Sequence, residues 1–179
     1  MTEIRLTSVV LRGWALGDAT SLARHANNRN IWRNFHDGFP SPYTEEDARE
    51  WVESQVGIDP PQNFAIDVDG EAAGGIGFEL AEADNIYRGT AGIGYWLGEA
   101  FWGRGIMSEA VAAVTTYAWQ TFPFERLEAW PFERNSASRR VLEKAGYVLE
   151  GRAHNRVRKE GELMADLLYA AYRPSSATL

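Results

Sequence analysis

A short glycine loop in the middle of the chain has the composition of an anion-binding site. Gly103, Arg104 and Gly105 stand directly before a long apolar-periodic segment that starts at Ile106. Glycines let a backbone turn sharply, and a helix start offers free N–H groups with the positive end of its dipole. Arg104 adds a cation beside those groups. This combination predicts a site for a pyrophosphate.

Two well-known phosphate loops do not match this segment. A Walker loop needs Gly-Lys followed by Ser or Thr before its helix, and the chain lacks that sequence. A dinucleotide fingerprint needs a third glycine three residues after the second, and that position holds Ser108. The pair of glycines alone is also compatible with a plain turn between a strand and a helix.

Hydrophobic periodicity predicts the elements that position this loop. We expect strands at 9–11, 64–68, 75–80, 91–97, 127–130, 147–149 and 163–172, and helices at 18–29, 44–59, 105–122 and 136–145. The fold class expected is α/β (α+β), with a mixed, mostly antiparallel twisted sheet of about six to seven strands and about four flanking helices. Residues 1–172 form a single domain in this interpretation, and 173–179 form a frayed tail.

Composition excludes several classes of function. The chain has no cysteine, so disulfides, thiolate metal sites and a cysteine nucleophile are excluded. A net charge of −7 disfavours nucleic acid as a partner. No apolar run approaches the ~20 residues that span a membrane, and the first residues lack the long apolar stretch of a signal peptide. We expect a cytoplasmic protein with no membrane partner.

Two motifs in the expected order resemble one family. Residues 94–110, GYWLGEAFWGRGIMSEA, resemble the acyl-CoA loop of the GNAT superfamily of N-acetyltransferases. The Gly-Tyr-Trp-Leu strand at 94–97, residues 102–106 and residues 108–110 are similar to the branch that acetylates the N-termini of ribosomal proteins. Asn135 to Ser138, followed by Val141 to Tyr147, resembles the Asn-x-x-Ser helix of that branch and its Gly-aromatic ending.

The resemblance implies acetyl-CoA as the co-substrate and no metal. The strands at 94–97 and 127–130 are expected to splay apart into a V that takes the pantetheine arm. The pyrophosphate is expected on N–H groups from about Trp102 to Met107, and Asn135 contacts the arm or caps its helix. The residues expected to bind the co-substrate are Trp96, Leu97, Trp102, Gly103, Arg104, Gly105, Ile106, Met107 and Asn135.

In this family an amine attacks the thioester directly. A backbone N–H near Trp96 or Leu97 is the expected donor to the oxyanion. Ser138 is the catalytic residue expected to donate a hydrogen bond to the departing sulfur, because Leu142 stands where many members have a tyrosine. The general base is unassigned, since several branches carry a glutamate where this chain has Gly92. Candidate bases elsewhere are Glu79, Glu128, His25, His36 and His154.

The amine acceptor is the least determined part. The family places the first two helices and a late hairpin on the acceptor side, here about 22–55 and 151–163. Residues 37–59 hold seven acids and one base, which favours a cationic acceptor, and Trp32, Phe35 and Phe39 offer an apolar wall. The acceptor is expected to be a protein N-terminus, as in ribosomal proteins, or a polyamine or aminoglycoside-like amine.

The missing tyrosine and the missing glutamate also permit a different class of protein, namely a catalytically weak acyl-CoA-binding sensor. Relatives similar to this chain are often homodimers, a state that the sequence permits without showing it.

Overall fold

The computed structural model describes residues 2–81 and 86–175. Its strands are β1 (Glu3–Arg5), β2 (Val10–Arg12), β3 (Asn63–Val68), β4 (Glu71–Leu80), β5 (Thr90–Leu97), β6 (Arg126–Ala129), β7 (Val148–Lys159) and β8 (Glu162–Tyr172). Its helices are α1 (Ala19–Ala26), α2 (Arg29–Trp32), α3 (Glu45–Gln55), α4 (Ile106–Thr121) and α5 (Ser136–Lys144), with 3-10 turns at Leu16–Asp18 and Glu99–Phe101. None of the helices in this described part is long and apolar enough to cross a membrane.

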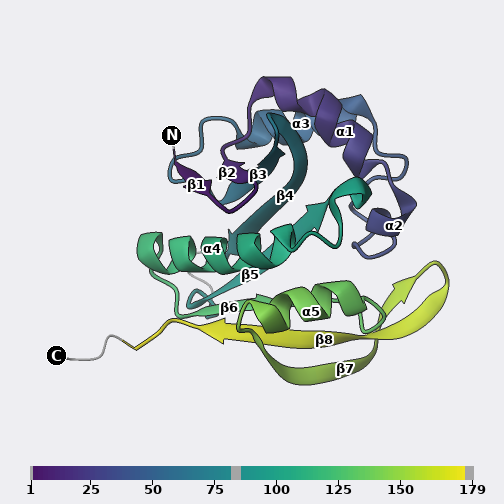
Figure 1. The fold of residues 1–179 in the computed structure, drawn as a ribbon. Coiled ribbons are helices and arrows are strands. Elements are labelled where there is room, and N and C mark those ends of the chain that lie inside the picture. Colours follow the sequence, from purple (N-terminus) through teal and green to yellow (C-terminus); the bar gives the residue numbers. More distant parts are fainter. Residues whose placement is uncertain (1, 82–85, 176–179) are drawn as a thin grey trace.

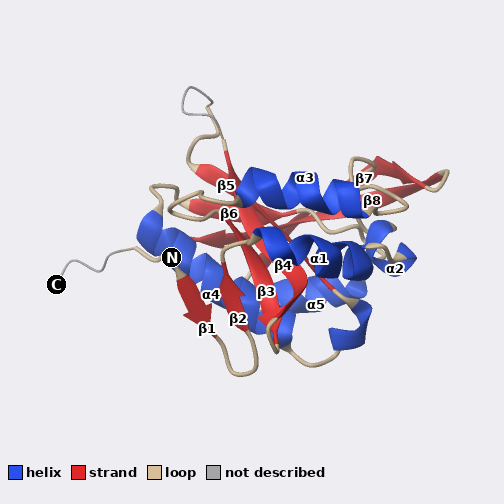
Figure 2. Cartoon of the chain, turned by 90° about the horizontal axis from the view of Figure 1, so that it is seen from above, coloured by secondary structure: helices blue, strands red, loops and turns tan. Residues whose placement is uncertain are grey.

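The strands form one sheet in the order β1-β2-β3-β4-β5-β6-β8-β7. All neighbours in it are antiparallel except β5 and β6, which run parallel. Figure 1 shows α4 and α5 on one face of the sheet and α1 and α3 on the other. Seen from above, α1 and α3 lie side by side across the sheet (Figure 2).

Each face of the sheet buries its own hydrophobic cluster. The larger cluster joins α4 and α5 to the sheet through fully buried side chains such as Val111, Leu127 and Leu142. The smaller one packs α1 and α3 on the opposite face around Leu22 and Val52. The two helical layers therefore fix the sheet from both sides, and α4 and α5 are held next to the strands that flank the glycine loop.

The parallel contact between β5 and β6 is short. It pairs Thr90 with Arg126 and ends at Gly92 and Glu128, although β5 runs on to Leu97. The two strands therefore separate, as the resemblance implies, and the sheet opens into a V beyond Gly92. This opening exposes the second half of β5 on the side that β6 would otherwise cover.

Polar signals fix two further elements. The Thr44 side chain accepts from the Asp47 N–H while Asp47 accepts from the Thr44 N–H, so a capping box begins α3 where the sequence predicts a helix start. Asp69 and Gly70 both have positive φ, at 54° and 88°, and form the predicted hairpin turn between β3 and β4.

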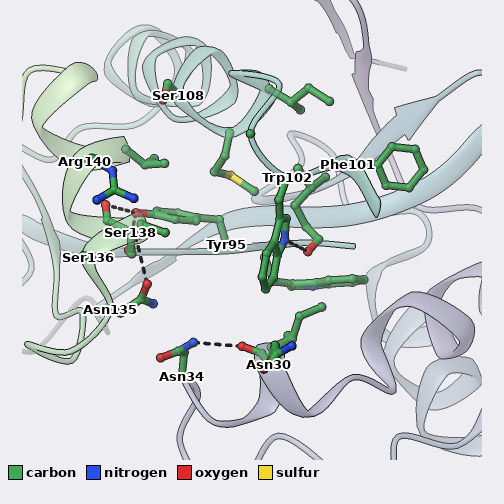
Figure 3. A pocket seen from close by; sticks show the side chains of 18 of the residues that line it. Asn30, Asn34, Tyr95, Phe101, Trp102, Ser108, Asn135, Ser136, Ser138 and Arg140 are labelled. Carbon is green, nitrogen blue, oxygen red and sulfur yellow. Dashed lines mark hydrogen bonds between the residues drawn. The ribbon is translucent and has the colours of Figure 1, made fainter. Parts of the chain in front are cut away.

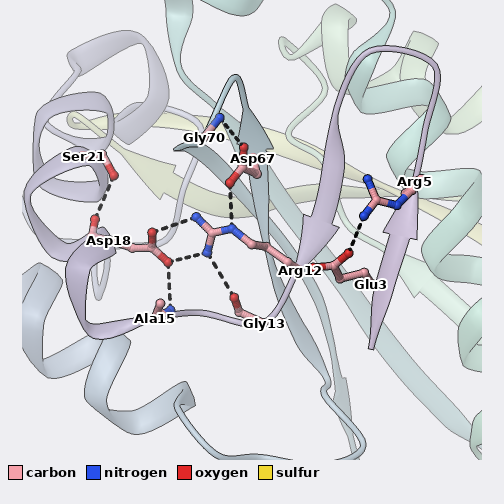
Figure 4. A network of polar contacts seen from close by, with 9 residues as sticks. All are labelled: Glu3, Arg5, Arg12, Gly13, Ala15, Asp18, Ser21, Asp67 and Gly70. Carbon is pink, nitrogen blue, oxygen red and sulfur yellow. Dashed lines mark hydrogen bonds and ion pairs between the residues drawn. The ribbon is translucent and has the colours of Figure 1, made fainter. Parts of the chain in front are cut away.

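A half-buried ion network ties the first strands to the start of α1. The Arg12 guanidinium donates to both carboxylate oxygens of Asp18, at 2.7 and 2.9 Å, and to Asp67 at 2.7 Å. Asp18 also accepts from the Ala15 N–H at 2.8 Å. Figure 4 shows this network beside an exposed pair between Arg5 and Glu3. The pKa of Arg12 is raised, chiefly by its hydrogen bond to Asp18.

The predicted fold class is confirmed, with differences in detail. The described residues form eight strands and five α-helices, because β1 adds a three-residue edge strand and α2 adds one turn inside the expected loop. The strand expected at 75–80 starts at Glu71, and the strand expected at 147–149 runs to Lys159, where pairing with β8 extends it. The helix expected to reach residue 59 ends at Gln55, before Gly57 with φ of +85°.

The expected C-terminal tail starts with an anchored residue. The Arg173 N–H donates to the Glu125 carbonyl at 2.9 Å, and its guanidinium donates to the Phe124 carbonyl at 3.0 Å. Residues 176–179 of that tail lie outside the described residues.

Candidate active site

The glycine loop has the backbone geometry that only glycine adopts easily. Gly103 and Gly105 have φ of +76° and +82°, and Gly105 caps the start of α4. A side chain at either position would meet no protein atom within 4 Å, so open space lies over the loop. The first N–H groups of α4 have no partner inside the helix. Arg104 is exposed, with its guanidinium over the Phe101 ring at 5.7 Å.

Trp102 connects this loop to the end of β5. Its indole N–H donates to the Leu97 carbonyl at 2.6 Å, and its backbone N–H donates to the Glu99 carbonyl at 3.2 Å. The backbone N–H of Trp102 is therefore already used, and it is not among the free donors expected for a pyrophosphate. The free donors start after it in the loop.

The exposed half of β5 presents backbone groups to the V. Gly98 donates its N–H to Ala73 on the β4 side at 2.8 Å. Because bonded and non-bonded positions alternate in an antiparallel pair, Trp96 also directs its N–H to β4. Tyr95 and Leu97 direct theirs to the side that β6 leaves open. Of the two oxyanion donors expected, Leu97 N–H is therefore the available one.

One cavity of about 710 Å³ contains the loop and the V. All nine residues expected to bind the co-substrate line it, and so does Ser138. Its remaining lining residues come from α2 with the turn after it, β5, the segment before α4, α4, and α5 with the turn before it: Asn30, Ile31, Arg33, Asn34, Phe35, Tyr95, Phe101, Ser108, Arg134, Ser136, Ala137, Arg140, Val141 and Lys144.

Two hydroxyl groups meet inside this cavity. The Tyr95 hydroxyl, from β5, lies 2.8 Å from Ser138 Oγ on α5 and 3.3 Å from the Ser138 carbonyl oxygen. Asn135 accepts from the Ser138 N–H at 3.1 Å, so it caps α5 as expected. Figure 3 shows the tyrosine ring reaching across the cavity to the serine. Burial raises the pKa of Tyr95, although the Ser138 hydrogen bond opposes that shift.

Tyr95 is a site residue that sequence reasoning missed. It lies in the Gly-Tyr-Trp-Leu strand, which was interpreted only as a backbone element. The alternation of side chains along a strand could have placed it on the same face as Ile93 and Leu97. Its contact with Ser138 depends on a helix 43 residues later, which no local pattern reveals.

The described wall of the cavity is cationic. Its charged side chains are all basic: Arg33, Arg104, Arg134, Arg140 and Lys144. A set of this kind suits the phosphates of a coenzyme A molecule, because cations neutralise the phosphate charge. Among the described lining residues there is no carboxylate and no histidine.

None of the candidate bases lines this cavity. Glu128 accepts from the Arg126 guanidinium and the Trp130 indole. His25 bonds Glu71, and its pKa is lowered by burial first and by Arg24 second. His36 and His154 are exposed, and His36 accepts from the Gly38 N–H.

Glu79 has a more informative position. It pairs with Gly92 across β4 and β5, so it stands directly opposite the position where several family branches carry a glutamate. The Glu79 side chain is exposed and does not line the cavity.

The acceptor side differs from the expected acidic surface. None of the seven acids in 37–59 lines the cavity. Most of them belong to the start and exposed face of α3, which packs beside α1 instead. The residues of the first helices that do line it are Asn30, Ile31, Arg33, Asn34 and Phe35. Of the expected apolar wall, only Phe35 is among them.

The hairpin between β7 and β8 contacts α2 and the segment that follows it. Buried Lys159 binds Asp37 at 2.8 Å and lies 3.7 Å from the centre of the Trp32 ring. Glu160 pairs with Arg29 at 2.6 Å, and its pKa is lowered mainly by that hydrogen bond. We call these five residues the clasp. Trp32 is thus part of a tertiary contact and not of the cavity wall.

Comparison with known proteins identifies the family. Residues 8–148 match the family model described as the acetyltransferase (GNAT) domain. A Bacillus subtilis protein named "Probable N-acetyltransferase YjcK" is 49% identical over 79 residues, which span 42% of this chain and 44% of that protein. The Escherichia coli ribosomal-protein-serine acetyltransferase is 33% identical over 111 residues, 60% of each chain. A ribosomal L7/L12 α-N-protein acetyltransferase solved with coenzyme A has a TM-score of 0.82 at 24% identity, covering 96% of this chain and 98% of that one.

The chain therefore belongs to the GNAT acetyltransferase family. This confirms the family, the fold class and the enzyme class predicted from the sequence. Two solved neighbours are titled as complexes with coenzyme A or acetyl-CoA. The similarity to the Bacillus subtilis protein spans less than half of that protein's length.

Proposed function

We propose that this chain transfers the acetyl group of acetyl-CoA to the α-amine of a protein N-terminus. The observation that carries the proposal is the described cavity wall, which holds five cations and no carboxylate or histidine. An α-amine has a pKa of about 7.7–8.0 and supplies its own neutral form near neutral pH, whereas a lysine amine at about 10.4 needs a base. The E. coli relative that acts on ribosomal-protein serine supports the same acceptor class.

The residues of the cavity fit the co-substrate. The N–H groups at the start of α4, with Arg104 and the α5 cations Arg140 and Lys144, would hold its phosphates. The open backbone edge of β5 at Tyr95 would pair with its extended arm. When bound, acetyl-CoA supplies the activated acetyl group. A structure similar to this chain is titled as a complex with coenzyme A, which supports this placement.

Two groups of the chain would then act on the reacting atoms. Leu97 N–H, on the open edge of β5, would donate to the developing oxyanion, a contribution of ~3 kcal/mol in comparable sites. Ser138 Oγ–H would donate to the departing sulfur. The amine loses its proton to water, because no described lining residue offers a base.

The acceptor class can be tested by the pH dependence of kcat/KM. Only the neutral amine attacks, so the logarithm of kcat/KM should rise with slope one and level off at about pH 8 for an α-amine peptide. The same peptide with a blocked α-amine and one lysine should react far more slowly at pH 7 and continue to rise toward about pH 10. Stopped-assay thiol release across pH measures both profiles.

Glu79→Gln is the control for a hidden base. Its profile should match the wild type, because Glu79 lies opposite Gly92 but outside the cavity wall. A levelling-off that occurs below pH 7 in the wild type and disappears in Glu79→Gln would contradict the proposal and assign the base to Glu79.

A polyamine or aminoglycoside-like amine with a lysine-type pKa would need a base, which no described lining residue offers, and this weighs against such an acceptor. A weak acyl-CoA-binding sensor would bind acetyl-CoA and release no thiol with any peptide.

The cytoplasmic location and the homodimer stay predictions.

A further inference from the structure

The Tyr95 hydroxyl has a position that the proposed chemistry leaves without a role. Tyr95 is the one tyrosine among the described residues that line the cavity. Its hydroxyl oxygen lies 2.8 Å from Oγ of Ser138, the expected catalytic residue. The two residues come from opposite sides of the V, one from β5 and the other from α5. The contact therefore joins β5 to α5 at the wall of the cavity.

The turn of α5 that follows Ser138 carries no hydroxyl group. The residue one turn after Ser138 is Leu142, which is fully buried in the core beneath α5. The Tyr95 ring reaches Ser138 from the neighbouring strand instead, and Figure 3 shows its hydroxyl end directed at the serine. A phenol therefore stands next to Ser138, although α5 carries none at Leu142.

The direction of the hydrogen bond decides where the serine proton points. The Tyr95 hydroxyl lies 2.8 Å from Ser138 Oγ, where either oxygen can donate, and 3.3 Å from the Ser138 carbonyl oxygen, which can only accept. If Tyr95 donates to Ser138 Oγ, the serine proton is free to point into the cavity. The Asn135 side chain accepts from the Ser138 backbone N–H at 3.1 Å and so holds the serine backbone in the first turn of α5. Burial keeps the tyrosine hydroxyl neutral, and a neutral hydroxyl can donate.

We propose that Tyr95 is a positioning residue that donates its hydroxyl proton to Ser138 Oγ and so aims the Ser138 proton at the departing sulfur. The inference rests on the proposed function and adds a residue to it. The two hydroxyls form a chain in which each polarises the next and makes the serine a stronger donor.

The step balances without a net proton transfer from this pair. The bond from the amine nitrogen to the acetyl carbon forms, the carbon–sulfur bond breaks, and sulfur leaves with the electron pair. Ser138 keeps its proton and donates a hydrogen bond to the sulfur anion, because a hydroxyl is a far weaker acid than a thiol of pKa about 8.5. The sulfur takes its proton from water on release.

The test measures the thiol pKa of coenzyme A bound to the protein. A pair that donates to a sulfur anion lowers this pKa, and the thiolate absorbs in the ultraviolet, so a pH titration of the complex reports it directly. Tyr95→Phe and Ser138→Ala should each raise the bound thiol pKa by about one pH unit and lower kcat about tenfold. The dissociation constant for acetyl-CoA should stay near the wild-type value. The lining cations are unchanged in both variants, so they do not contribute to the difference.

The double variant distinguishes positioning from an independent contact. If Tyr95 acts through Ser138, adding Tyr95→Phe to Ser138→Ala should change neither the thiol pKa nor kcat further. A further loss in the double variant would overturn the proposal, because Tyr95 would then act without the serine. A Tyr95→Phe protein with the wild-type thiol pKa would also overturn it.

Tyr147→Phe is a matched control for folding. The Tyr147 hydroxyl makes the same kind of buried contact, 2.8 Å from Thr115 Oγ1, outside the cavity. It should lower stability by an amount similar to Tyr95→Phe and leave the bound thiol pKa unchanged. A Tyr147→Phe protein that also raised the thiol pKa would overturn the specific role of Tyr95. Failure of the wild type to bind coenzyme A would defeat the proposed function itself, a separate result.

Discussion

Gly105→Val should raise the dissociation constant for acetyl-CoA by about 100-fold or more. Gly105 has φ of +82° and caps α4, and a β-branched residue is a strong outlier in that conformation. Valine would move the first turn of α4, whose N–H groups are the expected phosphate donors, and its side chain would occupy the open space over the loop. Calorimetric titration with acetyl-CoA measures the change.

Gly70→Val is the matched control. Gly70 has nearly the same backbone angle, φ of +88°, and equally open surroundings, but it lies in the turn between β3 and β4. Both substitutions should cost similar stability because the backbone strain is similar. Only Gly105→Val should lose affinity. Equal affinity in the two folded variants would show that the loop does not hold the phosphates.

Asp18→Ala should lower the free energy of unfolding by about 2–3 kcal/mol. Asp18 is 7% exposed and accepts from two Arg12 nitrogens and from the Ala15 N–H. Its removal leaves the half-buried Arg12 with Asp67 as its carboxylate partner. The figure stays below that of a fully buried pair because about a fifth of the Arg12 side chain is exposed. Urea denaturation measures the loss.

Glu3→Ala provides the comparison within the same part of the sheet. Glu3 pairs with Arg5 at 3.1 Å, but both side chains are largely exposed, so water already screens the pair (Figure 4). Its removal should change stability very little. If Asp18→Ala and Glu3→Ala proved equally mild, burial of the Arg12 network would not be the source of its strength.

Local sequence signals were sufficient where the structure is decided locally. The Asp69-Gly70 turn and the Gly105 helix start combine a positive φ with a residue suited to it, and Thr44 begins its helix through a side-chain cap. These three signals predicted a hairpin, a helix and the glycine loop before α4. The ten expected site residues meet at one cavity for the same reason, since most of them surround that loop.

The rest depends on partners far away in the chain. β7 continues to Lys159 through residues rich in Arg, His and Asn, which carry no strand signal of their own and pair because β8 lies beside them. The acids of 37–59 suggested a cationic acceptor, but α3 packs beside α1 and carries most of them away from the cavity. Charge in a sequence does not show which face of a fold it will occupy.

The short parallel contact at Gly92 also has a mechanical meaning. The sheet consists of a part with five strands and a part with three strands, which three residue pairs between β5 and β6 join. The separation of β5 and β6 at the open end depends on helix packing and on the clasp. In the clasp, Lys159 and Glu160 of the three-strand part bind residues of α2 and of the segment after it. Substitutions in the clasp can therefore widen or narrow the acceptor side while every residue at the reacting atoms stays the same.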